Sequence, residues 1–275
     1  MGDMLEDFAF FIPGISTGDL SNINRSTSLD ILHFYWPNYD DQAENMTDIM
    51  IDGYDKGVVP DDNDHLGWAQ LMTQIYTGFV FDSFMTRDVQ WHRTAGNENL
   101  WLFTLTHHSL LPFNSEVDGW IPISHSSDLP YLWFYPDIWD TYNASDADFA
   151  VAEYTGQMWT DFAKNGELPF PRVGEAMNYI EIGEVLTAKT NWRSDANTVF
   201  NQELPVYLGE FPPLKISDES WTKLKDTGEK VVSTWNSMPR CPSPATPTEP
   251  TTNTGAAILL PLLTASFILF LRIFS

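Results

Sequence analysis

Apolar residues recur every three or four positions in two stretches of the first hundred residues, which predicts two helices. One begins at a cap formed by Asn63 or Asp64, and the other runs from about Phe79 to Arg93. The apolar positions of the first are Leu66, Ala69, Leu71, Met72, Ile75 and Tyr76.

Two short stretches predict strands. Residues 100–106 are β-prone and carry apolar side chains at both odd and even positions, as expected for a strand buried on both faces of a sheet. Residues 178–182 alternate between apolar and polar side chains. Strands and helices in mixed order favour an α/β fold with large insertions.

The clearest helix begins at Ser145, which forms a capping-box pattern with Asp148. Gly166 stands where a left-handed cap would end this helix. We expect its buried face to carry Phe149, Ala152, Trp159, Phe162 and Ala163.

Residues 217–238 form a separate helical candidate, with apolar residues at spacings of three and four and Gly228 among them. Such a helix either docks on its own domain or joins copies of the chain. Cys241, the single cysteine, would then be placed for an intermolecular disulfide, because no disulfide can form within this chain.

Beyond this candidate the chain changes character. Residues 239–255 are rich in Pro, Thr and Ser and predict an extended stalk. Residues 256–275 form a hydrophobic tail in which almost nothing follows the apolar run Ala256 to Phe274, and this favours a GPI-anchor signal over a C-terminal transmembrane segment. We therefore expect a membrane attachment at the extracellular face of the plasma membrane.

The beginning of the chain disagrees with this tail, because its first thirty residues contain no signal-peptide pattern. A chain that looks exported but carries no export signal is most simply the back half of a longer protein. Three glycosylation sequons begin at Asn24, Asn45 and Asn143, and together with the tail they favour the lumenal side of a membrane.

Composition and net charge restrict the kinds of partner that this chain could bind. The chain is 43% hydrophobic and 14% aromatic, which is ample for a packed core. Its formal net charge of −24 argues against a nucleic-acid partner, because phosphates would be repelled. The charge keeps an exported surface soluble and is compatible with, but does not establish, a cationic ligand.

No motif within these residues identifies a metal or cofactor. The six histidines lack metal-ligand spacing, and His107 and His108 are adjacent, so that their side chains should point apart. There is no glycine-rich phosphate loop and no G-x-S-x-G nucleophile elbow. We expect no cofactor and no metal.

Two segments nevertheless resemble the type-B carboxylesterase/cholinesterase family of α/β-hydrolases. Residues 119–134 place His125 in a loop with small neighbours, as in that family's histidine loop, and residues 159–169 resemble its W-x-x-F-A-x-x-G-x-P signature. Residues 5–14 can be laid without a gap on the family's D-E-G-S-x-F segment, which carries the acidic triad member. The resemblance covers residues 1–210.

The resemblance implies that residues 1–214 are the C-terminal half of an α/β-hydrolase domain, a mixed sheet flanked by helices that is incomplete in this chain. It implies a serine esterase in which His125 is the general base and Glu6 the acid that orients it. The nucleophilic serine would lie upstream of Met1, so that this chain alone should be inactive. The substrate would be a small-molecule ester.

Two departures from the family pattern are visible. Ser126 replaces the glycine after the histidine, and Asp128 replaces the usual glutamate. The family also commonly joins the helices near Asp82 and Asn197 by a disulfide, and both positions lack cysteine. Several relatives have lost catalysis, so the alternative is a cholinesterase-like adhesion protein without activity.

Overall fold

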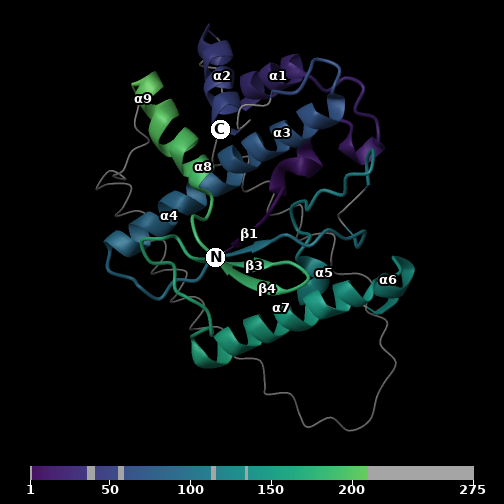
Figure 1. Ribbon diagram of the computed structural model, residues 1–275, viewed down its shortest axis with the longest axis vertical. Coiled ribbons are helices and arrows are strands. Elements are labelled where there is room, and N and C mark those ends of the chain that lie inside the picture. The colour runs from purple at the N-terminus through teal and green to yellow at the C-terminus, as the bar shows by residue number, and fades with distance from the viewer. Residues whose placement is uncertain (1, 36–40, 55–58, 113–115, 134–135, 210–275) are drawn as a thin grey trace, which may run out of the picture. The chain divides into compact units, whose positions relative to one another are not determined.

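The computed structural model describes residues 2–35, 41–54, 59–112, 116–133 and 136–209 (Figure 1). The candidate helix 217–238, the stalk 239–255, the apolar tail 256–275 and Cys241 lie outside these ranges. Within them, no helix is long and apolar enough to cross a bilayer.

Four strands form one sheet in the order β1 (Gly2–Met4), β2 (Phe103–Leu105), β3 (Tyr179–Ile182) and β4 (Leu186–Lys189). The first three are parallel and β4 is antiparallel to β3. Parallel neighbours need long crossovers, which here contain helices. The predicted α/β class, a mixed sheet flanked by helices, is therefore confirmed.

The two faces of the sheet differ in polarity. Met4, Leu105 and Ile182 share one register row and face α7 (Asp146–Asn165), the long teal helix of Figure 1. The adjacent row contains Asp3, Thr104 and Glu181. The predicted strand 100–106 is thus shorter than expected, and one of its faces is polar rather than apolar.

The other helices surround the sheet and a second apolar cluster. They include α1 (Arg25–Tyr35), α2 (Ala43–Tyr54), α3 (His65–Thr77), α4 (Ser83–Thr94), α5 (Leu129–Leu132), α6 (Pro136–Thr141), α8 (Ser194–Thr198) and α9 (Leu204–Leu208). Short 3-10 helices η1 (Asp7–Phe11) and η2 (Ile15–Thr17) follow β1. The second cluster is centred on side chains such as Phe8, Met46, Trp68 and Tyr76.

The two helices predicted between residues 63 and 93 are continuous. Asp64 caps α3 by accepting from the Gly67 N–H at 2.8 Å. A π-helical turn, η4 (Gly78–Asp82), then joins α3 directly to α4. Such turns often occur where a helix serves a functional site, because the extra residue changes the direction of the side chains that follow.

Local signals at the ends of α7 are confirmed, but its predicted buried face is wrong. Ser145 and Asp148 form the capping box, and Gly166 ends the helix in a left-handed conformation. The buried side chains are Asp148, Val151, Thr155 and Met158. Phe149, Trp159 and Phe162 are instead partly exposed, each packing its ring against a neighbouring aromatic side chain, namely Trp139, Phe103 and Trp101.

Polar contacts connect the two helices that the family would join by a disulfide. Gln90 on α4 donates to Asn197 on α8 at 2.9 Å. Arg87 donates to Asn201 at 2.7 Å, on the π-helical turn η5 (Val199–Glu203) that continues α8. Hydrogen bonds thus link elements that lack cysteines here.

Candidate functional site

The end of β1 lies beside the histidine loop. The Glu6 N–H donates to the Ile123 carbonyl at 3.2 Å, and the His125 N–H donates to the Asp7 carbonyl at 3.2 Å. Since β1 is held in the sheet by β2, this backbone pairing fixes residues 123–125 against the start of η1. It is this pairing that brings the side chains of Asp7 and His125 together.

His125 and Asp7 form an ion-pair geometry. His125 Nδ1 and Asp7 Oδ1 are 3.0 Å apart. The second carboxylate oxygen, Asp7 Oδ2, accepts from the Met4 N–H at 2.9 Å. An ionised Asp7 keeps the histidine proton on Nδ1, which leaves the lone pair on Nε2, the atom a general base uses.

Burial is unequal between the two partners. The Asp7 side chain is 4% exposed, whereas that of His125 is 54% exposed. The hydrogen bond with Asp7 raises the pKa of His125 despite partial burial. Burial raises the pKa of Asp7, and the hydrogen bond with His125 opposes that rise. The pair therefore combines a buried acid with an imidazole that solvent and ligands can reach.

Glu6, the acid predicted to orient His125, binds elsewhere. Its carboxylate accepts from Trp120 Nε1 at 3.1 Å and from the Ile123 N–H at 2.8 Å. Burial raises its pKa. The family resemblance assigned the role of orienting His125 to Glu6. In the gapless match to D-E-G-S-x-F, however, Asp7 takes the second acidic position, and Asp7 is the residue next to the imidazole. Asp7, which is not among the site residues predicted from the sequence, is the carboxylate that contacts His125.

Two further side chains shape the surroundings of His125. Phe81, on η4, stacks on the imidazole with ring centroids 5.2 Å apart and an interplanar angle of 26°. Ser126 adopts φ +73°, the left-handed region in which glycine is favoured. The serine thus preserves a glycine-like turn after the histidine at a conformational cost. Burial also raises the pKa of Asp128 nearby.

A cavity of about 280 Å³ opens beside this pair. Its walls include Asp7, Phe81, Met85, His125 and Leu129. Both members of the pair therefore line a mainly apolar hollow, in which a reacting group would find an acid–base partner. This is the arrangement expected of a site for acyl or proton transfer.

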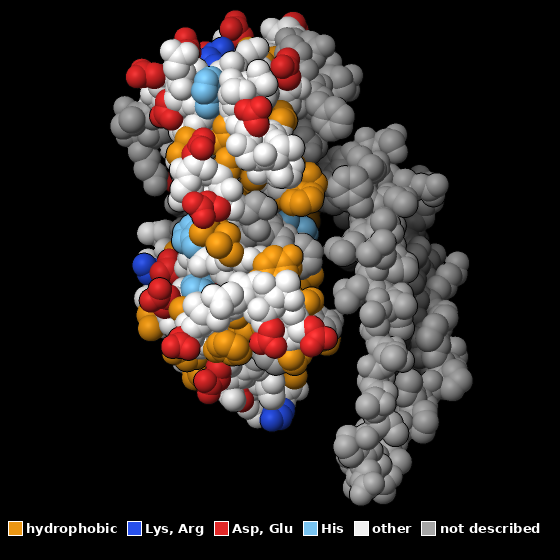
Figure 2. Space-filling view, turned by 90° about the vertical axis from the view of Figure 1, so that its right-hand side faces the viewer, with side chains coloured by type: hydrophobic (Ala, Val, Ile, Leu, Met, Phe, Trp, Pro, Cys, Tyr) orange, Lys and Arg blue, Asp and Glu red, His pale blue; other side chains and the backbone are white. Residues whose placement is uncertain are grey.

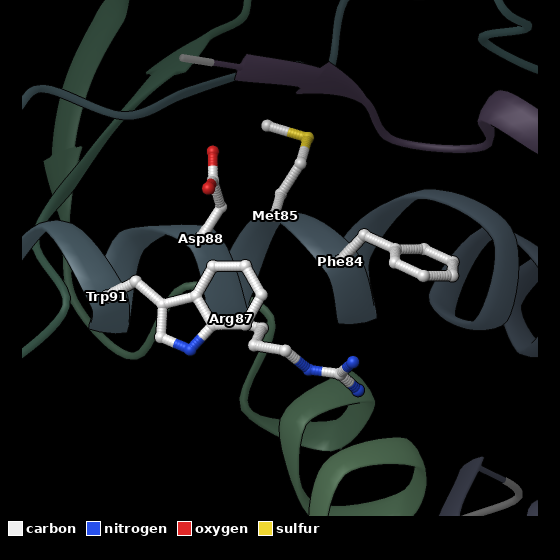
Figure 3. Close-up of a pocket in the computed structure, with 5 residues that line it drawn as sticks. All are labelled: Phe84, Met85, Arg87, Asp88 and Trp91. Atoms are coloured by element: carbon white, nitrogen blue, oxygen red, sulfur yellow. The ribbon is translucent and has the colours of Figure 1, made fainter. Parts of the chain in front are cut away.

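A second hollow, of about 300 Å³, lies along α4 (Figure 3). Met85 and Asp88 point from the helix toward β1, whereas Arg87 extends toward η5, where it binds Asn201. Phe84 and Trp91 complete its lining. Its lining has no histidine and no nucleophilic side chain, so it offers none of the chemistry of the first cavity.

The predicted glycosylation asparagines lie in different settings. Asn143 is exposed in the turn before α7, with φ +51°. Asn24 is half-buried and accepts from the Thr27 N–H at 3.3 Å. Asn45 is exposed on α2, but Thr47 of the same sequon is fully buried within that helix.

Acidic side chains are spread over the face in Figure 2, with few Lys or Arg side chains among them.

Among the described residues, no group of three His, Cys, Asp or Glu side chains could hold a metal ion. His107 and His108 bind different partners, Asp148 and the Ile121 carbonyl, as their adjacency predicts.

The structure matches solved carboxylesterases over part of their length. A carboxylesterase of Geobacillus stearothermophilus is 15% identical with a TM-score of 0.49, covering 72% of this chain and 39% of that one. For EstA of Aspergillus niger the identity is 13% and the TM-score 0.47, covering 72% and 38%. A PNB esterase is 13% identical with a TM-score of 0.43, covering 72% and 37%.

The chain thus spans about two fifths of the length of these carboxylesterases. No protein-family model and no curated protein sequence matches it. With TM-scores of 0.43–0.49 and identities of 13–15%, these structural matches carry no conclusion about the chemistry of this chain.

Proposed function

We propose that this chain supplies the acid–base part of a serine carboxylic-ester hydrolase. The observation that carries the proposal is the 3.0 Å contact between His125 Nδ1 and the buried Asp7 carboxylate, beside a cavity of about 280 Å³. A half-exposed imidazole oriented by a buried carboxylate is the arrangement that activates a serine hydroxyl.

In this proposal each residue has one role. A serine hydroxyl attacks the ester carbonyl while His125 Nε2 takes its proton, and the alkoxide leaves with that proton. His125 then takes a proton from water as the water attacks the acyl-enzyme, and it returns that proton to the serine oxygen when the acid leaves. Asp7, in place of Glu6, holds the imidazole tautomer and stabilises the imidazolium. The serine belongs to a segment outside these 275 residues.

The remaining features of the proposed protein rest on sequence patterns alone. The apolar tail 256–275 would attach it, through a GPI anchor, to the extracellular face of the plasma membrane. Residues 217–238 and Cys241 would join copies of the chain, and Asn24, Asn45 and Asn143 would carry glycans. A small-molecule ester would be the substrate.

The test uses the complete protein that contains these residues, treated with a biotinylated fluorophosphonate that labels activated serines. We expect one labelled serine peptide from a G-x-S-x-G segment, and loss of labelling in H125Q. H108Q is the matched control, because His108 is a neighbouring exposed histidine that binds the Ile121 carbonyl rather than Asp7.

Two outcomes would contradict the proposal. A complete protein with another residue at the nucleophile position, and no labelling, would favour the adhesion protein instead. Burst release of p-nitrophenolate from p-nitrophenyl acetate by residues 1–275 alone would show that the nucleophile lies within this chain.

A further inference from the structure

A cluster of buried charges lies next to Asp7, and the proposed chemistry does not use it. Asp3, Asp82 and Arg193 meet there from β1, η4 and the turn before α8. Arg193 Nε is 2.6 Å from Asp3 Oδ2 and 3.3 Å from Asp82 Oδ2. The side chains of Asp3, Asp82 and Arg193 are 0%, 3% and 17% exposed.

Hydrogen bonds to the two backbone groups of Met4 link Arg193 to Asp7, and Asp7 contacts His125. The guanidinium donates to the Met4 carbonyl at 3.0 Å, and the Met4 N–H donates to Asp7 Oδ2 at 2.9 Å. Asp7 Oδ1 then contacts His125 Nδ1. The same guanidinium holds the Asp3 carboxylate, so Arg193 grips both the side chain and the main chain at the end of β1.

Arg193 is itself held firmly. The neighbouring Trp192 donates from Nε1 to Thr104 Oγ1 at 2.9 Å, and that hydroxyl donates to Asp3 Oδ1 at 2.6 Å. Arg193 has φ +49° and Asn191 has φ +60°. Left-handed backbone at residues other than glycine is costly and persists where the surrounding structure enforces it. At Arg193 this backbone conformation places the guanidinium in the interior of the protein.

The charges in the cluster can balance. Burial raises the pKa of Asp82 well above its ordinary value; Arg193 opposes this, and the Asp3 and Asp7 carboxylates add to it. With Asp82 protonated, Arg193 offsets one of the two negative charges on Asp3 and Asp7, and His125 offsets the second when it takes up a proton. The other titratable groups that interact with these residues are Tyr54 from α2, Glu6, Asp128 and Tyr179.

We propose that Arg193 is a positioning residue for the Asp7–His125 pair. Its two-pronged contact with Asp3 and the Met4 carbonyl fixes the strand end whose Met4 N–H holds the Asp7 carboxylate toward the imidazole. This inference rests on the proposed function, since it deepens the role of the same site. A guanidinium is required because one planar fork must donate to two separate acceptors.

The test is the titration of His125 in the complete 275-residue chain labelled with [15N]histidine, with the resonance assigned by H125Q. D7N defines the midpoint of a histidine without its carboxylate. We expect R193K, which keeps the charge but loses the fork, to lower the His125 midpoint by most of the drop that D7N gives. Loss of nearby positive charge alone would raise the midpoint, so the sign separates positioning from charge.

R172K is the matched control, because it makes the same change at an exposed pair with Glu167 and should leave His125 unchanged. An unchanged His107 resonance shows that R193K is folded. If R193K does not fold, D3E replaces it: it keeps the negative charge but displaces the carboxylate from Arg193, so a lowered His125 midpoint would again report lost positioning rather than a changed charge.

The outcomes separate the two proposals. A His125 midpoint that D7N lowers, but that the folded Arg193 or Asp3 variant leaves unchanged, overturns the role of Arg193 and leaves the proposed function standing. A midpoint that D7N also leaves unchanged overturns the Asp7–His125 pair, and the proposed function with it.

Discussion

Two histidine–carboxylate pairs in this molecule have the same contact distance and opposite surroundings. His107 Nε2 lies 3.0 Å from Asp148 Oδ1, as close as His125 Nδ1 lies to Asp7 Oδ1. The side chains of His107 and Asp148 are, however, only 7% exposed. Asp148 also accepts from Tyr131 Oη and from Ser145. One pair opens on a cavity, whereas the other is enclosed by its own hydrogen bonds.

The comparison teaches that a histidine–carboxylate contact by itself does not indicate chemistry. The enclosed pair joins the loop after β2 to α5 and to the first turn of α7, so it connects three elements. The open pair connects two segments and leaves half of an imidazole accessible. Access, rather than distance, distinguishes a site from a structural connection.

The largest expected effect is the difference in catalysis between variants of the two histidines. In the complete protein, H125Q should reduce kcat for ester hydrolysis by about four to six orders of magnitude, because the general base is lost. H107Q should retain most of the kcat of folded protein, since His107 does not line the cavity. Steady-state kinetics with p-nitrophenyl esters measure both, and equal losses would contradict the distinction.

The second effect is on stability, and here the enclosed pair should matter more than the open pair. D148A should lower the free energy of unfolding by about 3–5 kcal/mol, because His107, the Tyr131 hydroxyl and the Ser145 cap all lose their acceptor. D7A should cost about 1 kcal/mol, since His125 can turn to solvent and one backbone N–H loses its acceptor. Urea unfolding followed by tryptophan fluorescence gives both values. A larger loss in D7A would contradict the comparison.

The third effect is a difference in pH dependence. The pKa of His125 is raised in the folded state, so its contribution is fully present below about pH 6.5 and is lost as pH rises through the folded value. Burial alone would raise the pKa of Asp148, but hydrogen bonds from His107, Ser109 and Ser145 lower it. Its contribution is therefore present above about pH 4 and is lost on further acidification.

Urea midpoints measured from pH 3 to pH 9 check these signs. H125Q should flatten the decline above neutral pH, and D148N should flatten the decline in acid. If either variant changed the opposite side of the profile, the assignment of that pair would be wrong.

The smallest effect sharpens the open pair alone. S126G should raise the free energy of unfolding by about 1 kcal/mol, because it removes a Cβ from a left-handed residue. S126A is the control, since it removes the hydroxyl but keeps the Cβ, and it should bring no such gain. Equal stabilisation by both variants would show that the hydroxyl, rather than the backbone, is responsible. Thermal unfolding of the 275-residue chain measures both.

The sequence predicted local features better than distant contacts. The capping box of Ser145 and Asp148 could be predicted because both partners lie within one turn. The buried face of α7 could not, because Asp148 is buried by His107, a residue 41 positions away. Large aromatic side chains on α7 suggested the core, yet they pack at its margin.

The same reasoning applies to the candidate site. His125 was predicted from the resemblance of residues 119–134 to the family's histidine loop, and the structure pairs it with a carboxylate. Asp7 holds the second acidic position of the gapless match to D-E-G-S-x-F, and the backbone pairing with residues 123–125 turns this carboxylate, rather than that of Glu6, toward the imidazole. Arg193 could not be predicted, because its partners lie near the opposite end of the domain sequence.

The pairing of β1, β2 and β3 also has a kinetic consequence. Gly2 lies opposite Phe103, and Phe103 lies opposite Ile180, so that each parallel contact closes a loop of roughly 80 to 100 residues. The hairpin of β3 and β4 and the hydrogen bonds within α7 are local. We therefore expect these local elements to form early and the strand carrying Asp3 and Met4 to join late, so that Asp7 meets His125 only in the last stage of folding.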